Sequence, residues 1–457
     1  MTKENKQEFF KYVSLNVLGM VALSLYFVVD TIFIGQALGN NGLAALNFAI
    51  PLFGVIHASG LMIGVGGAIK YNVFKSQGQQ LKANRVFTST LVFGVVLSLI
   101  FMILGLFFHD NMTRLLGARV GHVTFNMTAD YVRVILLFSP LYILHNILVA
   151  FIRNDGMPAI AMGGLLTSSV ANITFDYLFL FVLPLGMFGA AIASSIGALL
   201  GLIPLSMFFI LKKNTVTLGP FKGAFKFWPL IITLGLSTFL INFSYSAVMS
   251  LFNRLLDGLQ GTTAVAAYSI IANLSLLSIS VFVGVSQGVQ PLLTQAYSKN
   301  DSDKMRHILA LASFLIIALS TVIYTMFWFF GDVIVSGFNR DHDLVLQALA
   351  VEGMNIYFIG LFFAGLNILY SVFFSAIERP RFGLFIVLLR GLVIIIPISI
   401  ILSRLYGVRG VWFSFLLAEA LTLLIAYIVY IFKVKASDIF NNRNYVAPEH
   451  PYHHSEL

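Results

Sequence analysis

The sequence predicts an all-α polytopic membrane protein with 12 transmembrane helices in two six-helix lobes. Three observations support this prediction. Of the 457 residues, 58% are hydrophobic and only 10% are charged, whereas soluble proteins average roughly 25% charged residues. Apolar runs long enough to cross about 30 Å of hydrocarbon as a helix recur 12 times, and the two halves of the chain repeat each other.

The expected spans are residues 11–37, 44–74, 86–108, 128–152, 159–183, 187–211, 227–253, 263–296, 306–330, 346–376, 382–403 and 410–432. The first span is long, carries Asp30 and ends without a small-residue cleavage pattern, so we interpret it as a retained helix and not as a signal peptide. The chain has no cysteine, which excludes disulfides, thiol catalysis and cysteine-based metal sites.

The positive charge of the chain indicates its orientation. Of the 28 lysine and arginine residues, 20 fall in loops on one side of the predicted membrane, and the loops of the other side contain no lysine. By the positive-inside rule both termini lie in the cytoplasm, in agreement with an even number of helices. The net charge of +9 therefore orients the protein in the cell membrane and does not indicate a nucleic-acid partner.

An internal repeat is visible at an almost constant offset. Gly66 matches Gly288 and Pro158 matches Pro380, both 222 residues apart, and Gly186 matches a glycine 221 residues later. An even number of helices in each half makes both halves enter the membrane in the same direction, so the pseudo-twofold axis runs along the membrane normal.

The repeat and the loop composition predict the domain organisation. We expect an N-terminal lobe over 1–211, a cytoplasmic linker over 212–226, a C-terminal lobe over 227–435 and a disordered cytoplasmic tail over 436–457. The tail contains His450, His453 and His454. Without cysteine or acidic ligands these histidines do not predict a physiological metal site.

Polar residues inside the predicted helices are the candidate functional residues. A carboxylate such as Asp30 costs several kcal/mol in hydrocarbon unless it faces protein, water or an ion. Asn172 and Asp176 are four residues apart on one face of the fifth helix, and Ser194 lies on the small-residue sixth helix. At 1.5 Å per residue, Asp30, Asp176 and Ser194 all lie about 8–12 Å below the outer boundary, so they can share one pocket.

A pair of carboxylates in such a pocket favours a role in ion coupling. Desolvation and mutual repulsion disfavour the doubly charged state, so the pair holds a proton or a cation. The structural alternative is that hydrogen bonds from Asn, Ser and Tyr satisfy two packing residues. We favour the functional role because an amide or hydroxyl would serve a structural role at lower burial cost.

The second lobe does not repeat this site. It has Arg390 in the eleventh helix and Glu419 in the twelfth, close enough in depth for an interhelical ion pair; a role facing the cavity is the alternative. His57 and His145 also lie within predicted spans. A proton relay is one reading of these histidines, and hydrogen-bonded packing is the favoured one.

Several motifs occur together in a characteristic order. They are Y-x-x-V-D-x-x-F-I-G at 26–35, N-x-x-x-D at 172–176, Gly189-Ala190-Ala191 followed by Ser194, Q-G-V-Q-P at 287–291 and L-L-R-G-x-x-x-x-x-P at 388–397. Their order and spacing over residues 10–435 resemble those of the multidrug and toxic compound extrusion (MATE) family.

The resemblance implies a V-shaped transporter that exchanges external protons or sodium for amphipathic, often cationic, compounds. It also implies that Asp30, Asn172, Asp176 and Ser194 form one network, with Tyr26 one turn before the first acid. Most relatives have Thr where this chain has Ser194. Some relatives have Glu where this chain has Gln287, so Gln287 and Gln290 mark only a possible polar site in helix 8.

The expected function is secondary antiport that exports amphipathic small molecules in exchange for protons or sodium. The alternative is a flippase for a lipid-linked oligosaccharide, which we disfavour because Arg390 is the only cation in the middle of a predicted span. We expect no enzymatic activity and no cofactor. The expected partners are small-molecule substrates and the lipid bilayer, and the protein is expected to be a monomer.

Overall fold

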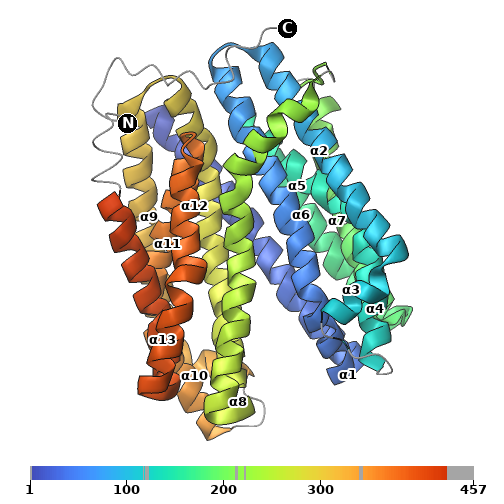
Figure 1. The fold of residues 1–457 in the computed structure, drawn as a ribbon, viewed down its shortest axis with the longest axis vertical. Coiled ribbons are helices and arrows are strands. Elements are labelled where there is room, and N and C mark those ends of the chain that lie inside the picture. Colours follow the sequence, from blue (N-terminus) through green and yellow to red (C-terminus); the bar gives the residue numbers. More distant parts are fainter. Residues whose placement is uncertain are drawn as a thin grey trace.

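The computed structural model describes residues 3–116, 118, 123–210, 215–220, 223–338 and 343–429. All regular secondary structure in these ranges is helical. The long helices lie side by side along the longest axis of the molecule (Figure 1). The predicted tail over 436–457, with its three histidines, lies outside the described residues.

The first half of the chain contains α1 (Lys3–Ser76), α2 (Gln80–Phe107), α3 (His109–Leu115), α4 (Val123–Leu137), α5 (Ser139–Asn154), α6 (Pro158–Tyr177), a π-helical turn (Leu178–Val182) and α7 (Gly186–Ile210). The second half contains a 3₁₀ turn (Ala224–Phe227), α8 (Trp228–Ser298), α9 (Ser302–Phe338), α10 (Leu344–Tyr357), a 3₁₀ turn (Phe358–Gly360), α11 (Leu361–Ala376), α12 (Pro380–Leu388), a π-helical turn (Leu389–Val393) and α13 (Ile395–Val429).

Nine helical stretches of the described residues are long and apolar enough to cross a membrane, or ten if α4 and α5 are counted as one bent span. The continuous helix expected over 128–152 is wrong, because α4 and α5 meet at an angle of 51°. The second residue of α5 is Pro140, which lacks an N–H and cannot continue the helix. The short helix α3 was also not predicted. The 12-helix, two-lobe arrangement stays a prediction.

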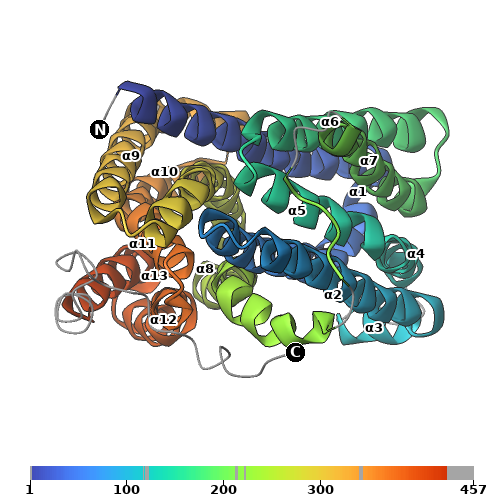
Figure 2. The same ribbon diagram turned by 90° about the horizontal axis from the view of Figure 1, so that it is seen from above.

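The buried apolar residues form two large cores. One core joins α1, α2 and α4–α7 around Tyr71, Phe151 and Phe208. The other joins α8–α13 around Phe282, Phe358 and Trp412. The two groups of helices occupy opposite sides of the molecule in both views (Figures 1 and 2).

The first helix of each half begins in the core of the other half. Phe9 and Val13, near the start of α1, are buried in the second core, and Ile231, near the start of α8, is buried in the first. Figure 2 shows α1 starting beside α9 and crossing to the side of α6 and α7. The two halves are therefore joined by a reciprocal exchange of helix ends.

Glycines allow these crossing helices to approach closely. A Cβ built on Gly66 would lie 2.0 Å from the Ile231 carbonyl oxygen, and one on Gly288 would lie 2.9 Å from the Val13 Cα. Val13 is 222 residues before Gly235, which packs its own backbone against α1. The matched pair Gly66 and Gly288 thus serves equivalent crossings in the two halves.

The backbone repeats at the same offsets. Residues with positive φ occur in pairs 221 or 222 apart: Gly39 (+63°) with Gly261 (+66°), Gly78 (+75°) with Asn300 (+55°), Gly156 (+101°) with Glu378 (+55°), and Gly186 (+64°) with Gly407 (+59°). Only Glu378 carries a long side chain in this strained region, which most residues avoid. The repeat seen in the sequence therefore extends to local backbone geometry.

Part of the predicted linker is held against the first half. The Thr215 N–H donates to Asp155 Oδ2 at 2.9 Å, and the Thr215 hydroxyl donates to Oδ1 of the same carboxylate. Lys75 Nζ pairs with that oxygen at 2.5 Å, and the Gly219 N–H donates to the Thr88 hydroxyl at 2.8 Å. Lys70, Lys75, Lys226 and Lys304 lie near the helix ends on this side of the molecule, which we call the lysine-rich end.

Candidate functional site

Asp30 of α1 and Asp176 of α6 lie together in the interior of the first half. Asp30 is 4% exposed and Asp176 is fully buried. Their side chains are hydrogen-bonded to each other, which requires one of the two carboxyl groups to carry a proton. The remaining oxygen of each group, Oδ1, has no other partner among the described residues.

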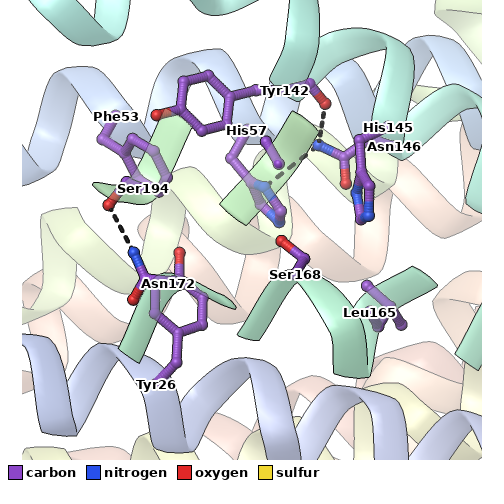
Figure 3. Close-up of a pocket in the computed structure, with 11 residues that line it drawn as sticks. Tyr26, Phe53, His57, Tyr142, His145, Asn146, Leu165, Ser168, Asn172 and Ser194 are labelled. Carbon is purple, nitrogen blue, oxygen red and sulfur yellow. Dashed lines mark hydrogen bonds between the residues drawn. The ribbon is translucent and has the colours of Figure 1, made fainter. Parts of the chain in front are cut away.

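Asn172 and Ser194 complete this cluster from α6 and α7. As drawn in Figure 3, Asn172 Nδ2 donates to Ser194 Oγ at 3.0 Å. The opposite amide orientation satisfies more groups: Nδ2 then donates to Asp176 Oδ2 at 2.9 Å, while the amide oxygen accepts from the Ser194 hydroxyl and N–H at 3.0 and 3.2 Å. Amide orientation is assigned from such networks, so we adopt the second arrangement.

A small cavity of about 30 Å³ adjoins the cluster. It is lined by Tyr26, Phe53, His57, Tyr142, His145, Asn146, Leu165, Ser168, Asn172, Ser194 and Ala198 (Figure 3). A cavity of this size holds about two water molecules. The structure thus brings together all five residues predicted for ion coupling, and it adds a polar cavity that sequence reasoning did not predict.

The arrangement can bind and release a proton at a fixed place. Two buried carboxyl groups in contact cannot both be ionised, and Asn172 supplies a neutral donor that holds one of them in position. A glycine contact tightens the frame, since a Cβ on Gly197 would lie 2.8 Å from the Ser168 carbonyl oxygen. The close packing of α6 on α7 therefore fixes the distance between Asn172 and Ser194.

Arg390 and Glu419 form an ion pair in the second half, with Arg390 Nη2 2.5 Å from Glu419 Oε1. Arg390 Nε also donates to both carboxylate oxygens, at 3.0 and 3.1 Å. Asn367 Nδ2 donates to Glu419 Oε2 at 2.8 Å. The pair lies among buried residues and does not line the cavity described above.

Gln287 contacts a residue that sequence reasoning did not place at its centre. Arg153 of α5 is 2% exposed and donates through Nη1 to Gln287 Oε1 at 2.7 Å and to Asn16 Oδ1 at 3.0 Å. Gln290 is fully buried, and neither its side-chain oxygen nor its nitrogen has a partner among the described residues. These contacts connect α5 and α1 to α8.

Two further contacts join the halves at the lysine-rich end. Lys70 Nζ of α1 lies 2.6 Å from Glu378 Oε1, and Asn72 Nδ2 donates to the Pro291 carbonyl oxygen at 3.3 Å. Lys70 and Glu378 are 308 residues apart, so no local pattern predicts their contact. The positive φ of Glu378, where the repeat has Gly156, is a signal that only the structure shows.

The described residues contain no group of three or more His, Asp or Glu residues that would hold a metal ion. The predicted histidines do not cluster as ligands. His57 Nδ1 contacts Asn146 Nδ2 at 3.2 Å, and His145 Nε2 contacts the Gly164 carbonyl oxygen at 3.4 Å.

Comparison with known proteins agrees with this architecture. The chain is 26% identical over 415 residues to multidrug export protein MepA of Staphylococcus saprophyticus, covering 90% of each chain. It is 27% identical over 420 residues to MepA of Staphylococcus haemolyticus, covering 91% of each.

Solved structures share the fold. An outward-facing multidrug resistance MATE family transporter of the MOP superfamily superimposes with a TM-score of 0.88 at 20% identity, covering 94% of this chain and 96% of that one. A MOP superfamily transporter from Pyrococcus furiosus gives 0.86 at 20% identity with the same coverage. The protein is a multi-pass membrane protein with the MATE transporter fold. The family model MatE matches residues 17–178 and 233–401, and the chain therefore belongs to the MatE family.

Proposed function

We propose that this protein is a secondary antiporter that exports amphipathic, cationic small molecules across the cell membrane in exchange for protons. The observation that carries the proposal is the direct hydrogen bond between the buried Asp30 and Asp176 side chains. Its similarity to relatives named multidrug export proteins supports the substrate class. Transport of this kind needs no cofactor and no partner subunit.

The choice of the proton over sodium rests on the geometry of the pair. A hydrogen bond between two carboxyl groups is itself a proton site. A cation of the hard, oxygen-binding kind would instead require several oxygen ligands to converge on one point. Here the oxygens of Asn172 and Ser194 are engaged with each other, which leaves the carboxyl pair as the site of exchange.

The contacts at the lysine-rich end supply the closed gate. We place this end and both termini in the cytoplasm, following the positive-inside rule. Lys70–Glu378, Arg153–Gln287 and Asn72–Pro291 then close the path from the cytoplasm. In this closed state the carboxyl pair takes a proton from outside and substrate leaves; when the gate opens, the proton is released inside and new substrate binds.

The flippase alternative has little support from the basic residues of the interior. A pyrophosphate-linked lipid requires free cations in the cleft, but Arg390 is paired with Glu419 and Arg153 is engaged with Asn16 and Gln287. These two arginines are therefore not available to a lipid phosphate in this state.

The test replaces Asp30 by Asn in proteoliposomes with an imposed proton gradient. One elementary charge crossing ~100 mV supplies about 2.3 kcal/mol and one pH unit adds about 1.4 kcal/mol, so one proton supports on the order of a 500-fold gradient of a fluorescent cationic dye. Asp30→Asn is expected to abolish this gradient while dye binding persists. The control is Asp130→Asn, which changes an exposed aspartate of α4. Dye accumulation at the wild-type level in Asp30→Asn would refute the proposal, and dye-driven sodium flux would replace the proton by sodium.

A further inference from the structure

The small cavity extends from the carboxyl pair along one face of α6. Asp176, Asn172 and Ser168 are spaced four residues apart, so each step descends about 6 Å along the helix. Asn172 and Ser168 both line the cavity, as does Leu165, one turn further on. Because α6 begins at Pro158, at the lysine-rich end, the cavity extends from the pair toward that end.

Two histidines of the cavity wall have defined protonation patterns. Asn146 Nδ2 donates to the Tyr142 carbonyl oxygen at 3.0 Å, and a carbonyl oxygen can only accept, so the orientation of this amide is fixed. The same Nδ2 contacts His57 Nδ1, which must therefore be the acceptor. Neutral His57 accordingly carries its proton on Nε2.

His145 has the opposite pattern. Its Nε2 contacts the Gly164 carbonyl oxygen, which again can only accept, so Nε2 carries the proton and Nδ1 is the basic nitrogen. The ring is held tightly, since a Cβ on Gly201 would lie 2.7 Å from Nε2. One wall of the cavity thus offers a proton donor, His57, and the other offers a proton acceptor, His145.

We propose that the cavity is a hydrated proton path, in which two water molecules held by Ser168 and His57 carry the coupling proton from the Asp30–Asp176 pair to His145. This inference rests on the proposed function. In the transfer, a carboxyl O–H bond breaks and leaves a carboxylate, the water molecules pass one proton along, and a new N–H bond forms at His145 Nδ1. The resulting imidazolium keeps its Nε2–H bonded to the Gly164 carbonyl oxygen.

The surroundings of His145 agree with such a role. The other ionisable groups lining the cavity are His57, Tyr26 and Tyr142, and Tyr142 is occupied by its hydroxyl contact with Ser195 at 2.9 Å. His145 is therefore the one group of the cavity wall that combines a basic nitrogen with a fixed ring. It is placed to hold the proton between the carboxyl pair and the lysine-rich end.

The experiment compares His145→Gln with the wild type in proteoliposomes, measuring dye-driven proton flux and dye affinity separately. Glutamine preserves hydrogen bonding but cannot hold the proton. Since a positioned proton-transfer group contributes about 10²–10⁴-fold in rate, the maximal antiport rate is expected to fall at least about 10-fold with unchanged KM for dye. The residual transport should also lose the solvent deuterium isotope effect of the wild type. The control, His307→Gln, changes an exposed histidine of α9.

A second matched pair guards against a folding defect in His145→Gln. Ser168→Ala removes a cavity hydroxyl, whereas Ser169→Ala removes a buried hydroxyl that bonds the Leu165 carbonyl oxygen of its own helix at 3.0 Å. The proposal expects slower proton flux in the first and wild-type flux in the second. Wild-type flux in both His145→Gln and Ser168→Ala would overturn it. If Asp30→Asn still abolishes coupling in that case, the antiport function stands and only the proton path fails.

Discussion

The ion pair between Lys70 and Glu378 makes a quantitative prediction about gating. Its atoms lie 2.6 Å apart, and the side chains are only 11% and 13% exposed. A hydrogen bond between charged groups contributes about 1.5–3 kcal/mol, so Glu378→Ala should raise the population open at the lysine-rich end by about 10- to 150-fold relative to the closed state. Lys70 still rests over the Phe74 ring, so the variant removes the pair alone.

The absence of cysteine from the chain makes the assay direct. Thr294 is fully buried on α8, one turn beyond Gln290, and Thr294→Cys introduces a single thiol at the closed gate. Its rate of modification by a membrane-impermeant maleimide, applied to the cytoplasmic face, reports the open population. Glu378→Ala should raise this rate by the factor given above, and the exchanged pair Lys70→Glu with Glu378→Lys should restore slow labelling.

Backbone strain gives the same residue a second, separable effect. Glu378 has a φ of +55°, which costs an L-residue about 1–2 kcal/mol relative to glycine. Glu378→Gly should therefore label as fast as Glu378→Ala but be more stable to unfolding by that amount. Equal, slow labelling of Thr294→Cys in Glu378→Ala and Lys70→Ala would refute the assignment of this pair to the gate.

Two further predictions concern helix packing and the second half. Gly66→Ala should also open the lysine-rich end, because its Cβ would lie 2.0 Å from the Ile231 carbonyl oxygen, whereas Gly54→Ala has nothing within 4 Å and serves as the control; Thr294→Cys labelling distinguishes them. Arg390→Glu or Glu419→Arg alone should cost about 3–5 kcal/mol, and the double variant should recover most of it, since the unpartnered Asn367 Oδ1 can accept from the new arginine once the amide turns over. Thermal unfolding of the purified proteins measures this, and no recovery would contradict it.

The sequence predicted the positions of the coupling residues because helices translate spacing into geometry. Asn172 and Asp176 had to share a face of α6, and counting residues from the helix ends placed Asp30 and Ser194 at a similar depth. The same arithmetic cannot show which helices are neighbours. Lys70 and Glu378 meet across 308 residues, and Arg153 meets Gln287 across 134, through the exchange of helix ends between the halves.

Local irregularities were also beyond the sequence pattern. A hydropathy profile reads residues 128–152 as one run, although Pro140 breaks it into two helices. The repeat was found from matching glycines and prolines, but the pairing of Gly156 with Glu378 was not, because the two residues differ chemically and share only a backbone conformation.

The contacts of Arg153 have a consequence for the energetics of turnover. Its printed partners, Asn16 and Gln287, are neutral amides, so parting the two halves there strands no anion in the protein interior. Breaking a buried arginine–carboxylate pair would cost about 3–5 kcal/mol and would slow each cycle by orders of magnitude, whereas an amide is rehydrated cheaply. A contact that is specific in geometry but weak in charge keeps the two states of a transporter close in free energy, which leaves the direction of the cycle to the ion and the substrate.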